Sequence, residues 1–114
     1  MEYWSIVSED KNNQNIKLRP KVTKILRILN KYLNTLSSDL ILVKLYSKCG
    51  IDEKVDKISI TQLSLLCEEF EINLSGIVGS ITAHIEMTKS DLLLDNEKKQ
   101  LSIHYAELLS QFWL

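Results

Sequence analysis

Glycine, proline and cysteine are scarce in this sequence, and each shortage excludes a class of structure or site. Three glycines and one proline among 114 residues are too few for an all-β chain with many tight turns. Three glycines spread over this length also form no glycine-rich phosphate-binding loop. The two cysteines, Cys49 and Cys67, have no second thiol or histidine at metal-ligand spacing, so we expect buried free thiols in a reducing cytoplasm.

Long apolar segments and a secretory leader are missing as well. No run of apolar residues approaches the roughly 18 that cross a bilayer. The opening residues, MEYWSIVSED, carry acids where a secretory signal has basic residues, and no apolar segment follows them. We therefore expect a soluble, cytoplasmic protein that does not bind membranes.

The sequence also lacks the signatures of a catalytic or metal centre. Its two histidines, His84 and His104, have no neighbours placed to converge with them on a metal ion. The acids form no distinct acid–base pair, and no serine lies in a nucleophile motif. We therefore predict a protein that is not an enzyme and that has no catalytic residues, no metal site and no cofactor.

Aliphatic residues at helical spacing are what the sequence has in abundance. Hydrophobic residues make up 45% of the chain, and its length suits one domain with one core. We expect a polar N-terminal arm over residues 1–19 and a single helical domain over residues 20–114. The first helix is predicted over about 20–36, because Pro20 suits a first helical turn and apolar residues then recur every three or four positions.

Capping residues place the next elements. Ser37 or Ser38 starts a second helix, and Gly50 ends it. The alternating residues ISI predict a short strand, after which Thr61 caps a third helix that runs to about Phe70. The connection INLS then leads into a fourth helix.

The fourth helix is predicted to begin at Ser75, with Ile77, Ile81 and Ile85 facing the core. After it, the last part of the chain can form either a helix or a hairpin. One stripe of apolar residues at helical spacing fits a single terminal helix, whereas an alternation over LSIHY, preceded by the polar run DNEKKQ, fits a hairpin. The hairpin, over about residues 92–105, fits slightly better.

The order of these elements resembles the winged helix-turn-helix fold of bacterial transcription regulators and plasmid replication initiators. The strand ISI is followed by TQLSLLCEEF, a turn, SGIVGSITAHIE and the candidate hairpin LLLDNEKKQLSIHY. We favour a mainly α-helical domain of about five helices with a short β-hairpin of winged-helix type. An all-α helical bundle is the alternative.

In that family the second helix of the motif reads bases in the DNA major groove. The matching positions here are Gly76, Gly79, Ser80, Ala83 and His84. Of these, the resemblance leaves Ser80 and His84 to hydrogen-bond with a base. The residues FEIN stand where the family has a tight turn that often contains glycine.

Basic residues are concentrated near the N-terminal end. Residues 11–32 hold seven of the fourteen lysines and arginines and no acid, whereas residues 33–114 hold seven bases against twelve acids. Phosphate binding needs several cations on one surface, although the same face could equally meet an acidic protein or remain a solvated helix surface. The candidate nucleic-acid contacts are Lys17, Arg19, Lys21, Lys24, Arg27 and Lys31, with Ser80 and His84 on the reading helix and Lys98 and Lys99 at the wing tip.

Three small residues, Gly76, Gly79 and Ala83, form a candidate partner-binding face on the fourth helix. Glycine inside a helix costs roughly 1 kcal/mol relative to alanine, so two of them need a reason. A partner helix or a nucleic-acid backbone laid across the face is one reason, and close packing within the domain is the other.

Two functions fit these patterns. The favoured one is a small non-catalytic nucleic-acid-associated regulator, in which the basic face holds the phosphate backbone and a dimer or a further partner supplies specificity. The dimer interface would lie on the helix at 20–36 or on the C-terminal residues LLSQFWL. The alternative is a protein–protein interaction module, an inhibitor or immunity-type protein that blocks a macromolecular target. The uncharged reading helix favours this alternative.

Overall fold

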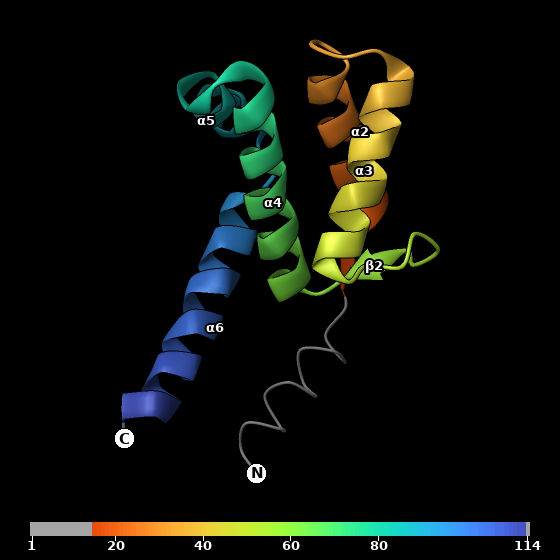
Figure 1. Cartoon of the computed structure of the whole chain (residues 1–114). Helices are drawn as coiled ribbons and strands as arrows, with labels where there is room; N and C mark the ends of the chain where they lie inside the picture. Colours follow the sequence, from red (N-terminus) through yellow and green to blue (C-terminus); the bar gives the residue numbers. More distant parts are fainter. Residues whose placement is uncertain (1–14, 114) are drawn as a thin grey trace.

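The computed structural model describes residues 15–113, with the side chains of 108 and 110–113 left out. These residues form five helices and a two-stranded antiparallel sheet, which confirms the mainly α-helical class (Figure 1). In chain order the elements are β1 (Ile16–Lys17), α2 (Leu18–Leu29), α3 (Thr35–Cys49), β2 (Lys57–Ile58), α4 (Ile60–Val78), α5 (Ser80–Ser90) and α6 (Asp95–Trp113). The first fourteen residues of the predicted arm lie outside this description, as do most side chains of the predicted interface LLSQFWL.

The chain reverses between α2 and α3, so the single helix predicted over 20–36 is wrong at its C-terminal end. The reason is Asn34, whose side-chain oxygen accepts a hydrogen bond from the Ser37 backbone N–H at 2.8 Å and so caps a new helix. Gly50 ends α3 with φ at 63°, in the left-handed region that favours glycine. This C-terminal cap confirms the prediction for Gly50.

The small sheet joins segments that are far apart in the sequence. Ile16 pairs with Ile58 and Lys17 pairs with Lys57. The Leu18 backbone N–H also donates to the Asp56 carbonyl at 2.9 Å. Because both isoleucines are buried, residues 16–19 belong to the folded domain rather than to the arm to which the sequence assigned them.

Helix α4 is longer than predicted and contains the expected turn INLS. It begins at a capping box, in which Ser59 accepts from the Gln62 backbone N–H and the Gln62 side chain accepts from the Ser59 backbone N–H. The hydroxyl of Ser75, predicted as a cap, instead donates to the Glu71 carbonyl one turn earlier at 2.8 Å. The helix is interrupted only at Gly79, where α5 follows directly.

Helix α6 occupies the segment in which a hairpin was favoured, so the predicted wing over 92–105 is wrong. Its first turn carries Asp95 and Glu97, which are favourable at the positive end of a helix dipole. The Glu97 carboxylate also accepts from the Leu94 backbone N–H at 2.9 Å, an N-terminal cap. The terminal helix, the other interpretation of the sequence, is therefore the one observed.

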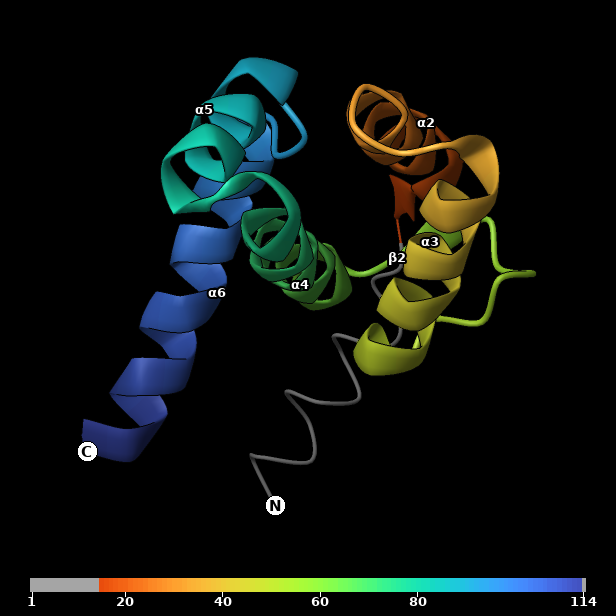
Figure 2. The same ribbon diagram turned by 45° about the horizontal axis from the view of Figure 1, so that its top comes forward.

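Helix α4 lies at the centre of the molecule and contacts α3, α5 and α6 (Figures 1 and 2). Its inner stripe is Leu63, Leu66, Phe70 and Leu74, and all four side chains are fully buried. In Figure 2, α2 and α3 lie on one side of α4, and α5 and α6 lie on the other. Helix α4 therefore separates the pair α2 and α3 from the pair α5 and α6. The contacts of α2 with α5 and α6 are made by individual side chains.

Candidate functional site

Lysine side chains of α2 make that connection, beginning with Lys21. Its Nζ atom donates to the Glu97 carboxylate at 2.6 Å and to the Leu92 carbonyl at 2.7 Å. The side chains of Lys21 and Glu97 are only 6% and 9% exposed. Lys21 therefore holds the start of α6 against α2 and is not accessible to a ligand, although the sequence placed it among the nucleic-acid contacts.

Two further lysines of the predicted basic face are also engaged within the molecule. The Lys24 ammonium donates to the Asp91 carbonyl at 3.0 Å, and the Lys31 ammonium pairs with Glu86 at 3.0 Å. Glu86 is buried on α5, whereas the Lys31 side chain is about half exposed. The inner part of the basic face thus ties α2 to the α5–α6 turn, and the turn after α2 to α5.

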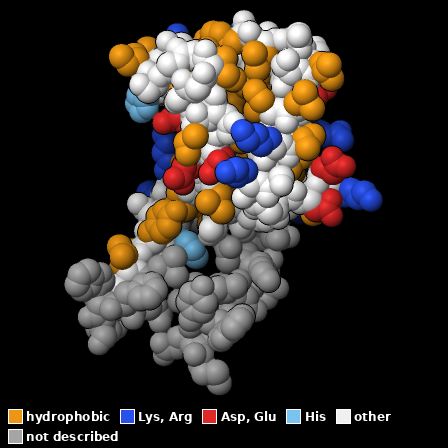
Figure 3. Space-filling model, viewed as in Figure 1, with side chains coloured by type: hydrophobic (Ala, Val, Ile, Leu, Met, Phe, Trp, Pro, Cys, Tyr) orange, Lys and Arg blue, Asp and Glu red, His pale blue; other side chains and the backbone are white. Residues whose placement is uncertain are grey.

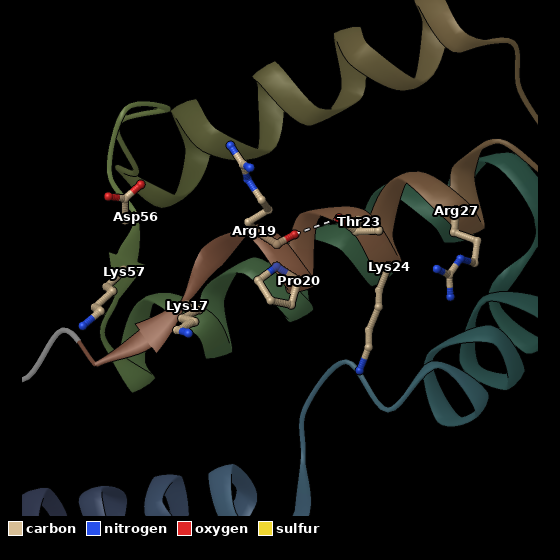
Figure 4. A pocket seen from close by; sticks show the side chains of 8 residues that line it. All are labelled: Lys17, Arg19, Pro20, Thr23, Lys24, Arg27, Asp56 and Lys57. Carbon is tan, nitrogen blue, oxygen red and sulfur yellow. Dashed lines mark hydrogen bonds between the residues drawn. The ribbon is translucent and has the colours of Figure 1, made fainter.

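A groove of about 620 Å³ runs along α2 from the sheet to the last turn of the helix, and the other cations of α2 line it (Figure 4). Lys17 and Lys57 face it from paired positions of β1 and β2, and Arg19 and Arg27 face it from α2. Within residues 15–113, none of these four forms an ion pair. The lining is Lys17, Arg19, Pro20, Thr23, Lys24, Arg27, Asp56 and Lys57.

Lys57 is the member of this groove that sequence reasoning missed. It lies in the acid-containing segment GIDEKVDK, which the sequence indicates only as a charged loop. The pairing of Lys17 with Lys57 brings the two lysines together across 40 positions of the chain. An isolated sequence carries no signal for this two-residue pairing.

The remaining nucleic-acid candidates do not line the groove. Ser80 and His84 are exposed on α5, and His84 Nδ1 lies 3.9 Å from the Glu71 carboxylate. Lys98 and Lys99 are exposed on α6 instead of on a wing, and Lys98 lies 3.9 Å from Asp95. The structure therefore leaves these four residues outside the groove that Lys17, Arg19, Lys24, Arg27 and Lys57 line.

The three small residues do not form one face. Gly76 is exposed within α4, Gly79 forms the break between α4 and α5, and Ala83 is fully buried against the rest of the domain. A Cβ atom added at Gly76 or at Gly79 would meet no heavy atom within 4 Å. Only Ala83 thus has the internal packing role that the sequence offered as an alternative.

The isoleucines at the end of α4 and on α5 are exposed, contrary to the prediction that Ile77, Ile81 and Ile85 face the core. Their exposed fractions are 37%, 77% and 45%. The break at Gly79 changes the direction of the chain, so the inward positions of α5 are Ala83 and Glu86. An acid is buried on this helix while isoleucines face solvent.

Helix α3 shows the same feature on its outer side. Leu36, Leu40 and Val43 follow one another at helical spacing with exposed fractions of 71%, 64% and 58%, although Leu36 falls within the apolar spacing of the helix predicted over 20–36. Figure 3 shows hydrophobic side chains gathered over the end of the molecule where α3 begins and α4 ends. We use the name apolar end for six exposed aliphatic residues of α3, of the second half of α4 and of α5: Leu36, Leu40, Val43, Ile72, Ile81 and Ile85.

Both cysteines are free thiols, as expected, and burial raises the pKa of each. For Cys67, burial outweighs the opposing effect of Lys21, and its pKa rises from an ordinary value of 9.0 to about 11. The side chain of Cys67 lies between the core and the buried ion pair of Lys21 and Glu97, whose charges both act on it. It is therefore an unreactive structural thiol.

We predict slow alkylation of Cys67 in the folded protein. Near pH 8 its thiolate fraction is about one-hundredth of that of an ordinary thiol. A thiolate of higher pKa is also the stronger nucleophile, which offsets part of this difference and leaves an alkylation rate about tenfold lower. The measurement is iodoacetamide labelling of native and guanidinium-unfolded protein, read by peptide mass spectrometry. Because the unfolded thiol ionises at lower pH, stability should also fall as the pH rises above about 9. Equal native and unfolded labelling rates would contradict the prediction.

Within residues 15–113, no three histidine, cysteine, aspartate or glutamate side chains are arranged to hold a metal ion. None of the described helices combines the length and the hydropathy that crossing a bilayer requires. Comparison of the chain with protein-family models, with characterised proteins and with solved structures finds no match.

Proposed function

We propose that the chain is a non-catalytic protein-interaction module that binds a protein partner through its apolar end. The observation that carries this proposal is the outward row of Leu36, Leu40 and Val43 on α3, all more than half exposed. A helix at the surface of a domain normally has polar residues on its outer side. Apolar residues gathered there are typical of a surface that another protein covers.

The construction of α5 supports the same proposal. Ile81 is the most exposed large hydrophobic residue described, while the buried Glu86 on the same helix needs Lys31 as its partner. In an isolated domain, the opposite orientation of α5, with its isoleucines buried and Glu86 in solvent, would be the more favourable one. Burying an aliphatic side chain fully contributes about 1.5–3 kcal/mol, so a partner that covers several of these residues gains a large driving force.

We infer an inhibitory or immunity-type role for this module, in which contact alone blocks a surface of the target. The apolar end carries no charge among its six residues, so its partner must offer a complementary apolar surface. In such interfaces a few central side chains supply most of the binding energy. Leu40 and Val43, near the middle of α3, are the side chains we expect to do so.

Leu40→Glu combined with Val43→Glu should abolish partner binding without unfolding the domain, because both side chains point into solvent. The partner is isolated on the immobilised protein from a nuclease-treated lysate of the native host, identified by mass spectrometry and purified. Calorimetry with the purified partner should then show affinity lowered at least about 30-fold, the loss of about 2 kcal/mol typical of a central contact.

The matched control is Gln100→Glu combined with Ser102→Glu, which adds the same charge at exposed positions of α6. This control should bind as the unchanged protein does. Sedimentation equilibrium gives a second readout, since a dimer that the α3 variant alone dissociates would identify the partner as a second copy of the chain. Equal affinities of the α3 variant and the unchanged protein would overturn the proposal.

A further inference from the structure

The groove beside α2 has an excess of positive charge in its lining. Five lysine and arginine side chains line it from three elements, and Asp56 is the one acid among the lining residues. The first turn of α2 adds to this potential, because it contains no acid and its N-cap, Lys17, provides no side-chain cap. The positive end of the helix dipole is thus not neutralised.

The cations lie on different sides of the groove. Figure 4 shows Arg19 directed to the side of α3, and Lys24 and Arg27 directed to the opposite side of α2. Arg19 and Arg27 are eight residues apart, which corresponds to about 12 Å along the helix axis. A lone phosphate could contact only one of these sides, whereas successive phosphates of a nucleic-acid backbone, which place one charge every few ångströms, could contact cations on both.

Lys24 is held in position for such a contact. One of its three ammonium hydrogens is donated to the Asp91 carbonyl, and Figure 4 shows the side chain extended toward the α5–α6 turn. The other two hydrogens have no partner among the described contacts. A lysine that is already anchored loses less conformational entropy when it binds than a free one does.

We propose that this groove binds the sugar–phosphate backbone of a nucleic acid without reading its sequence. The lining contains no aromatic side chain on which a base could stack and no asparagine or glutamine that could pair with a base edge. It also offers no large apolar side chain for insertion into a lipid surface. The site lies on β1, α2 and β2, away from the helix to which the winged-helix resemblance assigns base reading.

The test uses fluorescence anisotropy with a labelled DNA duplex of random sequence. Affinity should fall steeply between about 50 and 200 mM salt, with a slope of log K against log salt of about −4.5 if the five cations meet phosphates. Arg19→Glu with Arg27→Glu should lower affinity at least about tenfold and reduce the slope by about 2. Arg19→Gln with Arg27→Gln is the milder second variant, and circular dichroism confirms that each variant is folded.

Lys44→Glu with Lys48→Glu is the matched control, because it makes the same change of charge at exposed positions of α3 outside the groove. It should keep most of the affinity. Absence of binding at low salt, or equal losses in the control and the groove variants, would overturn the proposal. Polyglutamate or anionic phospholipid vesicles bound as tightly as the duplex would also overturn it, in favour of an acidic protein or a membrane surface.

Discussion

Lys21→Met should lower the free energy of unfolding by about 3–5 kcal/mol, the usual loss when one partner of a buried ion pair is removed. The substitution leaves the Glu97 carboxylate, 9% exposed, with the Leu94 N–H as its remaining hydrogen-bond donor among the described contacts. It also leaves the Leu92 carbonyl without the ammonium that it accepts from. Methionine fills a similar volume, so the loss reports the uncompensated charge instead of a cavity.

Urea unfolding followed by circular dichroism measures this effect, and a double substitution separates charge from packing. Lys21→Met with Glu97→Gln should recover a large part of the loss, because the amide oxygen of glutamine can still accept from the Leu94 N–H while no charge is buried. Lys24→Met is the control on the same helix. It removes one exposed hydrogen bond to the Asp91 carbonyl and should lower the free energy of unfolding by about 1 kcal/mol at most. A Lys21 variant no less stable than this control would show that the pair carries little of the stability.

The role of Lys21 explains why the basic segment was only partly interpretable from sequence. Seven cations without an acid in 22 residues look like a solvated face, since local spacing reveals only local partners. Glu97 lies 76 positions away from Lys21, and Glu86 lies 55 positions away from Lys31. Arg19 and Arg27, which face outward, are the positions where the pattern and the structure agree.

The mainly α-helical class was predictable because it depends on local signals. Aliphatic spacing predicts the helices, and Gly50 ends α3 in the conformation that glycine favours. The hairpin failed where two periods coexist: LSIHY alternates, but it also fits a helical stripe. The acids at the start of α6 and the cap by Glu97 favour the helix, and the hairpin interpretation gave them no weight.

The orientation of α5 was beyond sequence reasoning for a different reason. Ile77, Ile81 and Ile85 form one stripe only if the helix is continuous from Ser75 onward. The break at Gly79 changes the helix axis, so the two parts of the stripe no longer share a face. If a partner covers these isoleucines, as we propose, they also do not follow the rule that apolar residues mark the core.

Gly76 and Gly79 should respond in opposite directions to the same substitution. Gly76 is inside α4, and the space for a Cβ atom is free, so Gly76→Ala should raise the free energy of unfolding by about 0.5–1 kcal/mol. Gly79 adopts φ 90° and ψ 157°, a conformation that residues with a side chain rarely reach. Gly79→Ala should therefore lower the free energy of unfolding by about 1–3 kcal/mol, even though its Cβ would meet no neighbour.

The two alanine variants serve as controls for each other, since they add the same methyl group three positions apart on the chain. Urea unfolding should separate them by roughly 2–4 kcal/mol, with the unchanged protein between them. The sign at Gly79 depends on backbone conformation alone, because no neighbouring atom opposes the methyl group. A Gly79→Ala variant as stable as Gly76→Ala would mean that α4 and α5 join without the left-handed break. The isoleucines of α5 would then turn inward, and the apolar end would lose its most exposed residue.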